Sequence, residues 1–513
     1  NHALGAEDGH GRNVAVGYEA LKVQDAGADA YNVAVGYQAG LAISTGVRNT
    51  IMGGLAGDAL TTGGNNTVMG YLALSTEDAG SYNIAIGNYA LENQDAGDAY
   101  NVAIGYFAGR QVTTGTNNVI IGGLAGDALT TGEYNVAIGR DALTTEDTGD
   151  RNVAIGYGAL YNLNYDGAAY NVAVGHSAGS QITTGIDNVI IGGLAGDALT
   201  SASYSTAVGR GALGTEDTSS HNTAIGYLSM SGGQNAAKNV AIGNNTLQVL
   251  QPGSNTDTYN VAIGYNAGIV MTTGIENTII GGLAGDAFTT GISNTAIGFR
   301  ALSTEDGHSY NTAIGAEALF TQNAGANAYN VALGYAAGTA VTTGVENTIM
   351  GSNAGDALTS GSYNVAIGMH ALGGEDAHGR NVAIGNEALR AQNAGADAYN
   401  VAVGFQAGYA MSTGVRNVIV GGLAGDAITT SSYNTAVGHA ALSSEDTHGY
   451  NVAIGLSALE TLNAGADAYN TAVGWNSGYA MTTGVQNTVI GAAAGDALTT
   501  GSYNTAVGYL ALS

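Results

Sequence analysis

An asparagine returns at nearly constant intervals along the whole chain, and this repeat limits the folds that the sequence can adopt. Twenty-nine coils start at this position, mostly 17 residues apart with a recurring step of 19, and only Ser205 replaces the asparagine. Glycine stands four residues after every start, and alanine stands seven residues after 26 of them. A period this short indicates a solenoid whose neighbouring coils stack directly on one another. The first of these repeated residues are Asn13, Asn32, Asn49, Asn66, Asn83 and Asn101, Gly17, Gly36, Gly53 and Gly70, and Ala20 and Ala39.

The coils form a block of four types that spans about 70 residues and runs seven times. In the first full block the four types are residues 13–31, 32–48, 49–65 and 66–82, and one additional coil, residues 239–259, carries the only proline, Pro252. Both ends of the sequence fall inside a fourth-type coil. We therefore expect residues 1–513 to be one continuous repeat region and a segment of a longer fibre protein.

Each coil reads as short extended segments separated by turns. Val102-Ala103-Ile104 is apolar and contains β-branched residues, and Gly105 ends it. Glycine in every coil and the lack of a 3.6-residue apolar period argue against helix. The sequence therefore predicts an all-β fold, a parallel β-solenoid or β-roll of 29 coils that rises about 4.8 Å per coil.

In such a stack each repeated residue can be given a physical role. Asparagine amides can bond along the axis, as in the ladders of stacked β structures. Glycine four residues later permits a positive φ or a close approach of backbones. Alanine at the seventh position indicates a narrow interior that would reject a larger side chain.

Strand alternation sends Val and Ile of the Asn-Val-Ala-Ile-Gly segment to one face and Ala to the other. Third-type coils instead carry apolar residues on both faces, such as Ile51-Met52 and Ile120-Ile121. A strand that is apolar on both sides is normally covered on both sides. One face can be the solenoid core, so we expect the other to be covered by a partner, and a thin roll favours association of several parallel chains.

The composition narrows the function classes. The formal charge is −28, from 40 acidic and 12 basic residues, so nucleic acid is not an expected partner. No apolar stretch approaches the roughly 20 residues of a membrane-spanning helix. No cysteine is present, and every acidic or histidine motif recurs with the repeat, whereas enzyme sites are singular constellations. We expect a structural protein and no enzyme.

Segments such as Asn83-Ile84-Ala85-Ile86-Gly87-Asn88-Tyr89-Ala90 resemble the YadA-like head repeats of trimeric autotransporter adhesins. The resemblance covers essentially the whole chain. It implies a left-handed roll, a parallel homotrimer or fibre, an extracellular or cell-surface location, and adhesion to host surfaces, matrix or glycans. The coils here have 17 or 19 residues rather than about 14. Similar repeats also resemble shafts of phage or virus tail fibres, and the flanking sequence would distinguish this alternative from an adhesin shaft.

One acidic pair recurs in each block, and neighbouring coils add further carboxylates. Stacking can bring such groups within reach of one Ca²⁺, which prefers six to eight oxygen ligands. The simpler interpretation is a solvated, mutually repelling face, and the sequence favours it because no glycine-rich calcium-binding repeat is present. The candidate cation ligands are Glu77, Asp78 and Asp95, Glu146 and Asp147, and Glu375 and Asp376, and the same pair recurs as Glu7-Asp8, Glu216-Asp217, Glu305-Asp306 and Glu445-Asp446.

A histidine follows four of these pairs, as His10, His308, His378 and His448. A transition-metal site is one interpretation of this spacing. A surface histidine is the interpretation that the sequence favours, because the second and third blocks lack it.

Overall fold

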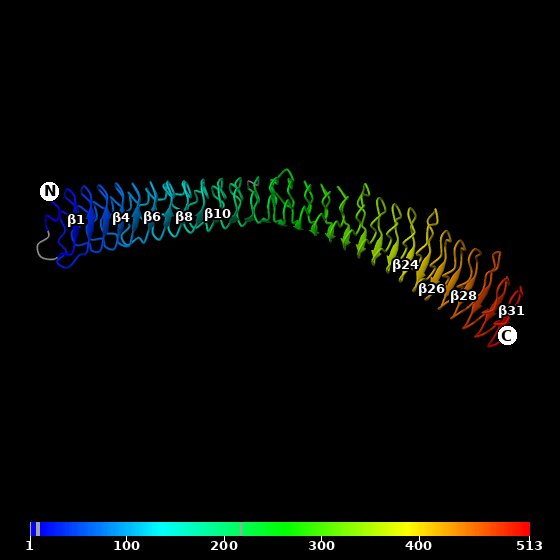
Figure 1. The fold of residues 1–513 in the computed structure, drawn as a ribbon. Coiled ribbons are helices and arrows are strands. Elements are labelled where there is room, and N and C mark those ends of the chain that lie inside the picture. Colours follow the sequence, from blue (N-terminus) through cyan, green and yellow to red (C-terminus); the bar gives the residue numbers. More distant parts are fainter. Residues whose placement is uncertain (1, 7–10, 216–217) are drawn as a thin grey trace. The chain divides into compact units, whose positions relative to one another are not determined.

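In the computed structural model, which describes residues 2–6, 11–215 and 218–513, all regular secondary structure is β. Two compact units are present, one ending at Tyr259 and one comprising Asn260–Ser513. Each unit is a parallel β-solenoid with one three-residue strand per coil, so the predicted fold class is confirmed. Figure 1 shows the strand arrows of successive coils side by side within each unit.

In the first unit, the strands are β1 (Val14–Val16), β2 (Val33–Val35), β3 (Thr50–Met52), β4 (Thr67–Met69), β5 (Ile84–Ile86), β6 (Val102–Ile104), β7 (Val119–Ile121), β8 (Val136–Ile138), β9 (Val153–Ile155), β10 (Val172–Val174), β11 (Val189–Ile191), β12 (Thr206–Val208), β13 (Thr223–Ile225), β14 (Ala236–Ala237), β15 (Val240–Ile242) and β16 (Thr256–Asp257). The added coil gives this unit its second small sheet, in which β14 pairs in parallel with β16.

The second unit repeats the same strand without a side sheet. Its strands are β17 (Val261–Ile263), β18 (Thr278–Ile280), β19 (Thr295–Ile297), β20 (Thr312–Ile314), β21 (Val331–Leu333), β22 (Thr348–Met350), β23 (Val365–Ile367), β24 (Val382–Ile384), β25 (Val401–Val403), β26 (Val418–Val420), β27 (Thr435–Val437), β28 (Val452–Ile454), β29 (Thr471–Val473), β30 (Thr488–Ile490) and β31 (Thr505–Val507).

Consecutive coils pair in exact sequence register, so equal positions of the repeat stack as columns. In the pair β6 and β7, for example, Val102 lies opposite Val119, Ala103 opposite Ile120 and Ile104 opposite Ile121. The middle residue is buried in every three-residue strand except β1, where Ala15 is half-buried, whereas the two flanking residues are half-buried or exposed. The core therefore lies on the alanine side of the strand, and the Val and Ile side forms an outer face.

The asparagines form the predicted ladder. The backbone N–H of Asn49 donates to Oδ1 of Asn32 at 2.8 Å, and its side-chain Nδ2 donates to the carbonyl oxygen of Gly63 at 2.8 Å. Nearly all of these asparagines are buried. The Nδ2 atoms of Asn83, Asn311 and Asn381 have no partner, because the longer first-type coil shifts the carbonyl that other coils supply.

The glycine that ends each strand serves both predicted purposes. Gly17, Gly36, Gly53 and Gly70 have φ between 139° and 146°. A Cβ at Gly17 would lie only 2.1 Å from the carbonyl oxygen of Gly36. No other residue fits, because both the backbone conformation and the neighbouring coil forbid a side chain.

The alanine at the seventh position is in the interior, as predicted. Ala20 and Ala39 are completely buried. Together with the middle residue of each strand, they line a thin core whose larger members include Ile43, Ile51 and Leu60.

Candidate functional site: acidic loops and the outer sheet face

The recurring acidic pairs lie in what we call the acidic loops, residues 77–80, 146–149, 305–308, 375–378 and 445–448. The glutamate of each loop is completely buried. It takes the place in the coil, eleven residues after the ladder asparagine, that Ile43 and Leu60 occupy in other coil types. The interpretation of the pairs as a solvated face is therefore wrong for these glutamates, because their position points into the core. The pairs Glu7-Asp8 and Glu216-Asp217 lie outside the described residues.

Each buried carboxylate accepts a hydrogen bond from the backbone N–H three residues later. Oε1 of Glu77 accepts from Gly80 at 2.6 Å, and Oε1 of Glu146 accepts from Gly149 at 2.8 Å. In Glu77 the second oxygen also reaches the next coil, because Oε2 accepts from Nε2 of Gln94 at 3.1 Å. Glu77 therefore closes its own loop and ties it to the coil that follows, whereas Oε2 of Glu305 and Oε2 of Glu375 have no hydrogen-bond partner.

Burial raises the pKa of every one of these glutamates against the opposing effect of the backbone hydrogen bonds. The pKa rises to about 7 for Glu146 and Glu375. It also rises for Glu77, Glu305 and Glu445. The acidic loops therefore contain carboxyl groups that are harder to ionise than exposed ones.

The aspartates of the pairs lie closer to solvent. Asp78 and Asp376 are exposed, Asp147 is half-buried, and Asp95 of the following coil is exposed. The backbone of the pair is also used structurally, because the carbonyl oxygen of Asp147 accepts hydrogen bonds from the N–H and the Oγ1 of Thr130 in the preceding coil. The loop backbone is thus held by the preceding coil.

Four of the loops bring a third ionisable side chain close to the pair. Ligand atoms of Glu77, Asp78 and Asp95 lie within 4.8 Å of one another, as do those of Glu375, Asp376 and His378. The equivalent groups at residues 305–308 and 445–448 have the same arrangement. Among the described residues, no third such side chain joins Glu146 and Asp147. These groups are the residues that can hold a cation.

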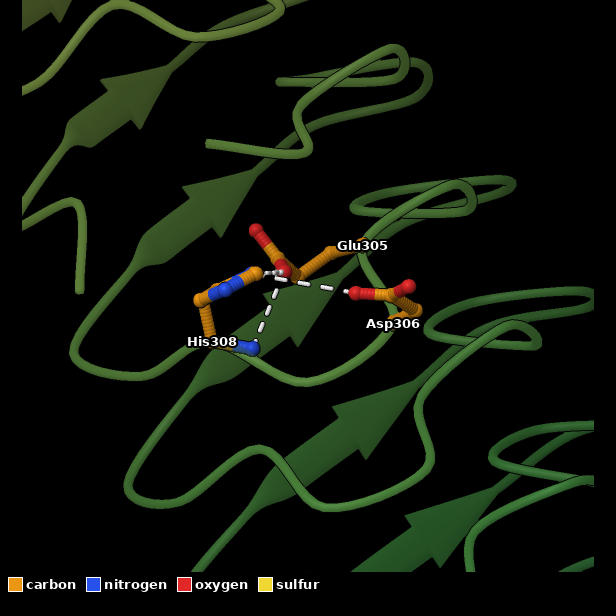
Figure 2. A group of neighbouring side chains, drawn as sticks. All are labelled: Glu305, Asp306 and His308. Atoms are coloured by element: carbon orange, nitrogen blue, oxygen red, sulfur yellow. Dashed lines mark hydrogen bonds and ion pairs between the residues drawn. The ribbon is translucent and has the colours of Figure 1, made fainter. Parts of the chain in front are cut away.

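Histidine is tied into the loop where it is present. Figure 2 shows Glu305, Asp306 and His308 turned toward one another, with Nδ1 of His308 at 2.9 Å from Oε1 of Glu305. The corresponding distance between His378 and Glu375 is 3.9 Å. His10 lies outside the described residues. His308 is therefore a hydrogen-bonded partner of the buried glutamate, whereas Nδ1 of His378 has no hydrogen-bond partner and Nδ1 of His448 lies 2.9 Å from Oγ1 of Thr447.

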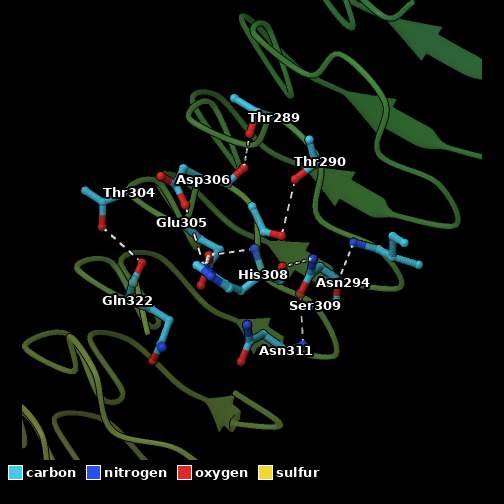
Figure 3. Close-up of polar contacts among 12 residues, drawn as sticks. Thr289, Thr290, Asn294, Thr304, Glu305, Asp306, His308, Ser309, Asn311 and Gln322 are labelled. Carbon is cyan, nitrogen blue, oxygen red and sulfur yellow. Dashed lines mark hydrogen bonds and ion pairs between the residues drawn. The ribbon is translucent and has the colours of Figure 1, made fainter. Parts of the chain in front are cut away.

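Threonine side chains also bond the acidic loops to the preceding coil. Oγ1 of Thr289 donates to the carbonyl oxygen of Asp306 at 2.6 Å, and Asn294 Nδ2 donates to that of His308 at 2.9 Å (Figure 3). The threonine bond therefore crosses between coils, whereas the asparagine bond closes the loop within its own coil.

The outer sheet face consists of the residues one and three positions after each ladder asparagine. These positions carry only Val, Ile, Leu, Met and Thr. Val189 and Ile191 are 37% and 40% exposed, and Leu333 is 41% exposed. Apolar residues at this exposure, repeated along a whole unit, form a surface of the kind that other protein covers.

Aromatic columns border this face. Tyrosines directly before the asparagine stack, as do Tyr82 and Tyr100 with ring centroids 4.9 Å apart. Arginine inserts into the same column, and the guanidinium of Arg151 lies 5.3 Å from the ring of Tyr134 and 5.7 Å from that of Tyr170. Tyrosine therefore forms stacked ladders along the coils, and Tyr82 and Tyr100 stay about half exposed.

Sequence reasoning missed two features of these surfaces. It did not place the acidic-loop glutamates in the core, although aligning residue 77 with residues 43 and 60 would have indicated it. It also did not recognise that the residue five positions after the asparagine is small in every third-type coil.

No protein-family model matches this chain, and no curated protein does. Within the part of the chain that the structure describes, there is no helix with the length and apolar character needed to cross a membrane.

Proposed function

We propose that the chain is the shaft of an extracellular fibre or adhesin, in which parallel copies associate through the outer sheet face. The observation that carries this proposal is the continuous apolar column of half-exposed Val, Ile and Met side chains. A thin solenoid gains little from its own core, so covering this second face supplies stability that one chain lacks. The resemblance to YadA-like repeats supports a homotrimer, an extracellular location and a role in surface attachment.

The distribution of charge supports association on this face rather than on any other. The outer sheet face and its two bordering columns, one position before and five positions after each ladder asparagine, contain 3 of the 40 acidic residues and 8 of the 12 basic residues. The rest of the chain therefore carries almost all of the negative charge. Two copies that approach through any other surface bring like charges together, whereas this face presents few.

The test compares the association of the full chain with that of two double variants. Val189→Asp with Ile191→Asp puts charge on the outer sheet face, and Thr114→Asp with Thr184→Asp puts the same charge on exposed threonines elsewhere in the first unit. Sedimentation velocity over a concentration series gives the oligomeric state, and far-UV circular dichroism verifies that the β structure is kept.

We expect the wild-type chain and the threonine variant to form the same oligomer and the outer-face variant to dissociate. A wild-type chain that stays monomeric at every concentration would contradict the proposal. So would an outer-face variant that associates as tightly as the wild-type chain while remaining folded.

A further inference from the structure

A second feature of the repeat concerns the corner column, which we define as the residues five positions after each ladder asparagine. Rings stack in this column where adjacent coils carry them, as Tyr18 and Tyr37 do at 5.5 Å. In every third-type coil the column holds a small residue instead. These residues are Gly54, Gly123, Gly193, Gly282, Ser352, Gly422 and Ala492.

Neither the backbone conformation nor the packing of the chain itself requires small residues at these positions. None of the five glycines has a positive φ. A Cβ at Gly193 would meet nothing within 4 Å, and at Gly54 its nearest neighbour would be Cδ2 of Tyr71 at an ordinary 3.7 Å. This differs from the strand-ending glycines, where φ and sterics exclude every side chain. Neither φ nor a clash at Cβ excludes a side chain at these glycines in the isolated chain, so the consistent absence of one points to something outside the chain.

Large side chains flank each small residue along the column. Second-type coils carry an aromatic or imidazole ring at this position in all seven blocks, and fourth-type coils carry Tyr, Arg, Phe, Met or His. The coils remain in register here, because Leu55 N donates to the carbonyl of Tyr37 at 2.8 Å and Leu72 N donates to that of Gly54 at 3.2 Å. Each block therefore places one small residue of this column between large residues two coil steps or about 10 Å apart, and we call this position the notch.

We propose that these notches receive side chains from a second copy of this chain and set the register in which copies associate. This rests on the self-association proposed above and adds where the copies interlock. A partner that fills a notch in each block must present protrusions with the same four-coil period. The large residues of the corner column in this chain have that period, and the neighbouring outer sheet face carries little acidic charge to repel a second copy.

Notch filling provides the test, with a matched control in the same column of the second unit. The notch variant carries Ser352→Trp and Gly422→Trp. The control carries Asn386→Trp and Leu456→Trp, which add two indoles to the corner column in first-type coils. Sedimentation velocity measures association of the full chains, and circular dichroism with thermal unfolding verifies that each variant is folded.

We expect the notch variant to fold like the wild-type chain and to associate at least tenfold more weakly, while the control keeps wild-type affinity. Equal association of notch variant and control, whether both are weakened or neither is, would overturn the inference and leave the proposed function standing. A wild-type chain that never associates would instead remove the proposed function and this inference together.

Discussion

The buried carboxyl of Glu146 leads to a prediction that links stability to pH. Its pKa lies at about 7 in the folded chain, against an ordinary value of 4.5. A pKa difference of this size makes ionisation of the folded carboxyl cost roughly 3 kcal/mol more than ionisation of an exposed one. Because the folded chain binds the proton more tightly, this contribution to stability is fully present below about pH 4.5. It is lost as the pH rises through about 7.

The informative perturbation is Glu146→Gln. The chain already places glutamine at the equivalent core position in first-type coils, where Gln24 and Gln94 are buried, so the amide fits. Glutamine resembles the protonated carboxyl and keeps an oxygen to accept the N–H of Gly149. The variant should therefore match the wild-type chain at pH 4 to 5 and exceed its local stability by up to about 3 kcal/mol at pH 8.

Hydrogen exchange is the suitable assay, because a stack of coils opens locally and a single global unfolding free energy averages over many of them. Protection of the amides in residues 146–165 is compared between variant and wild-type chain across the pH range, after correction for intrinsic exchange rates. Asp78→Asn removes the same charge from an exposed side chain and controls for the change in net charge. A difference between Glu146→Gln and wild type that does not grow with pH would refute the reasoning.

Three further predictions concern packing and ions. Ala195→Leu should lower the unfolding free energy by about 1 to 3 kcal/mol through overpacking, measured as a lower melting temperature, and an unchanged melting temperature would place Ala195 outside the core. Gly105→Ala should cost at least about 2 kcal/mol, since its Cβ would lie 2.5 Å from the carbonyl oxygen of Gly122, whereas Gly193→Ala should be nearly neutral in the same melts. CaCl₂ and NaCl at equal ionic strength should shift the melting temperature equally, because the buried glutamates already accept backbone N–H groups; a larger shift with CaCl₂, abolished by EDTA, would indicate a shared ion at Glu77, Asp78 and Asp95.

The fold could be predicted from the sequence because every coil of a solenoid has to meet the same packing and hydrogen-bonding requirements. The asparagine, glycine and alanine positions each satisfy one physical requirement, and stacking in register repeats that requirement along the chain. Asn49, Gly53 and Ala56 therefore have the same roles as the residues at the equivalent positions of the other coils. Even the uncertainty over which side of the strand is the core follows from the pattern, since third-type coils are apolar on both sides.

The acidic loops could not be predicted in the same way, because the property that matters is orientation rather than residue type. Glutamate beside aspartate, with glycine or histidine two residues on, is typical of a solvated turn. The path of the chain between strand and turn places Glu77 inward and Asp78 outward, and only the structure fixes that path. Histidine was likewise ambiguous, since its hydrogen bond to Glu305 depends on the glutamate being buried where it is.

A buried glutamate in each described acidic loop costs free energy, and a leucine or isoleucine would pack the same site without that cost. The hydrogen-bond partners of Glu77 indicate what this burial contributes to the fold. Glu77 is bonded to Gln94 and to the backbone of Ala96, both in the next coil. If the stack slipped by one coil, Glu77 would face the apolar position of Val112 and lose its amide partner, which is strongly unfavourable for a buried polar group. Near-identical coils can otherwise exchange neighbours at little cost, and the polar contact between Glu77 and Gln94 penalises such a slip at the coils that carry it.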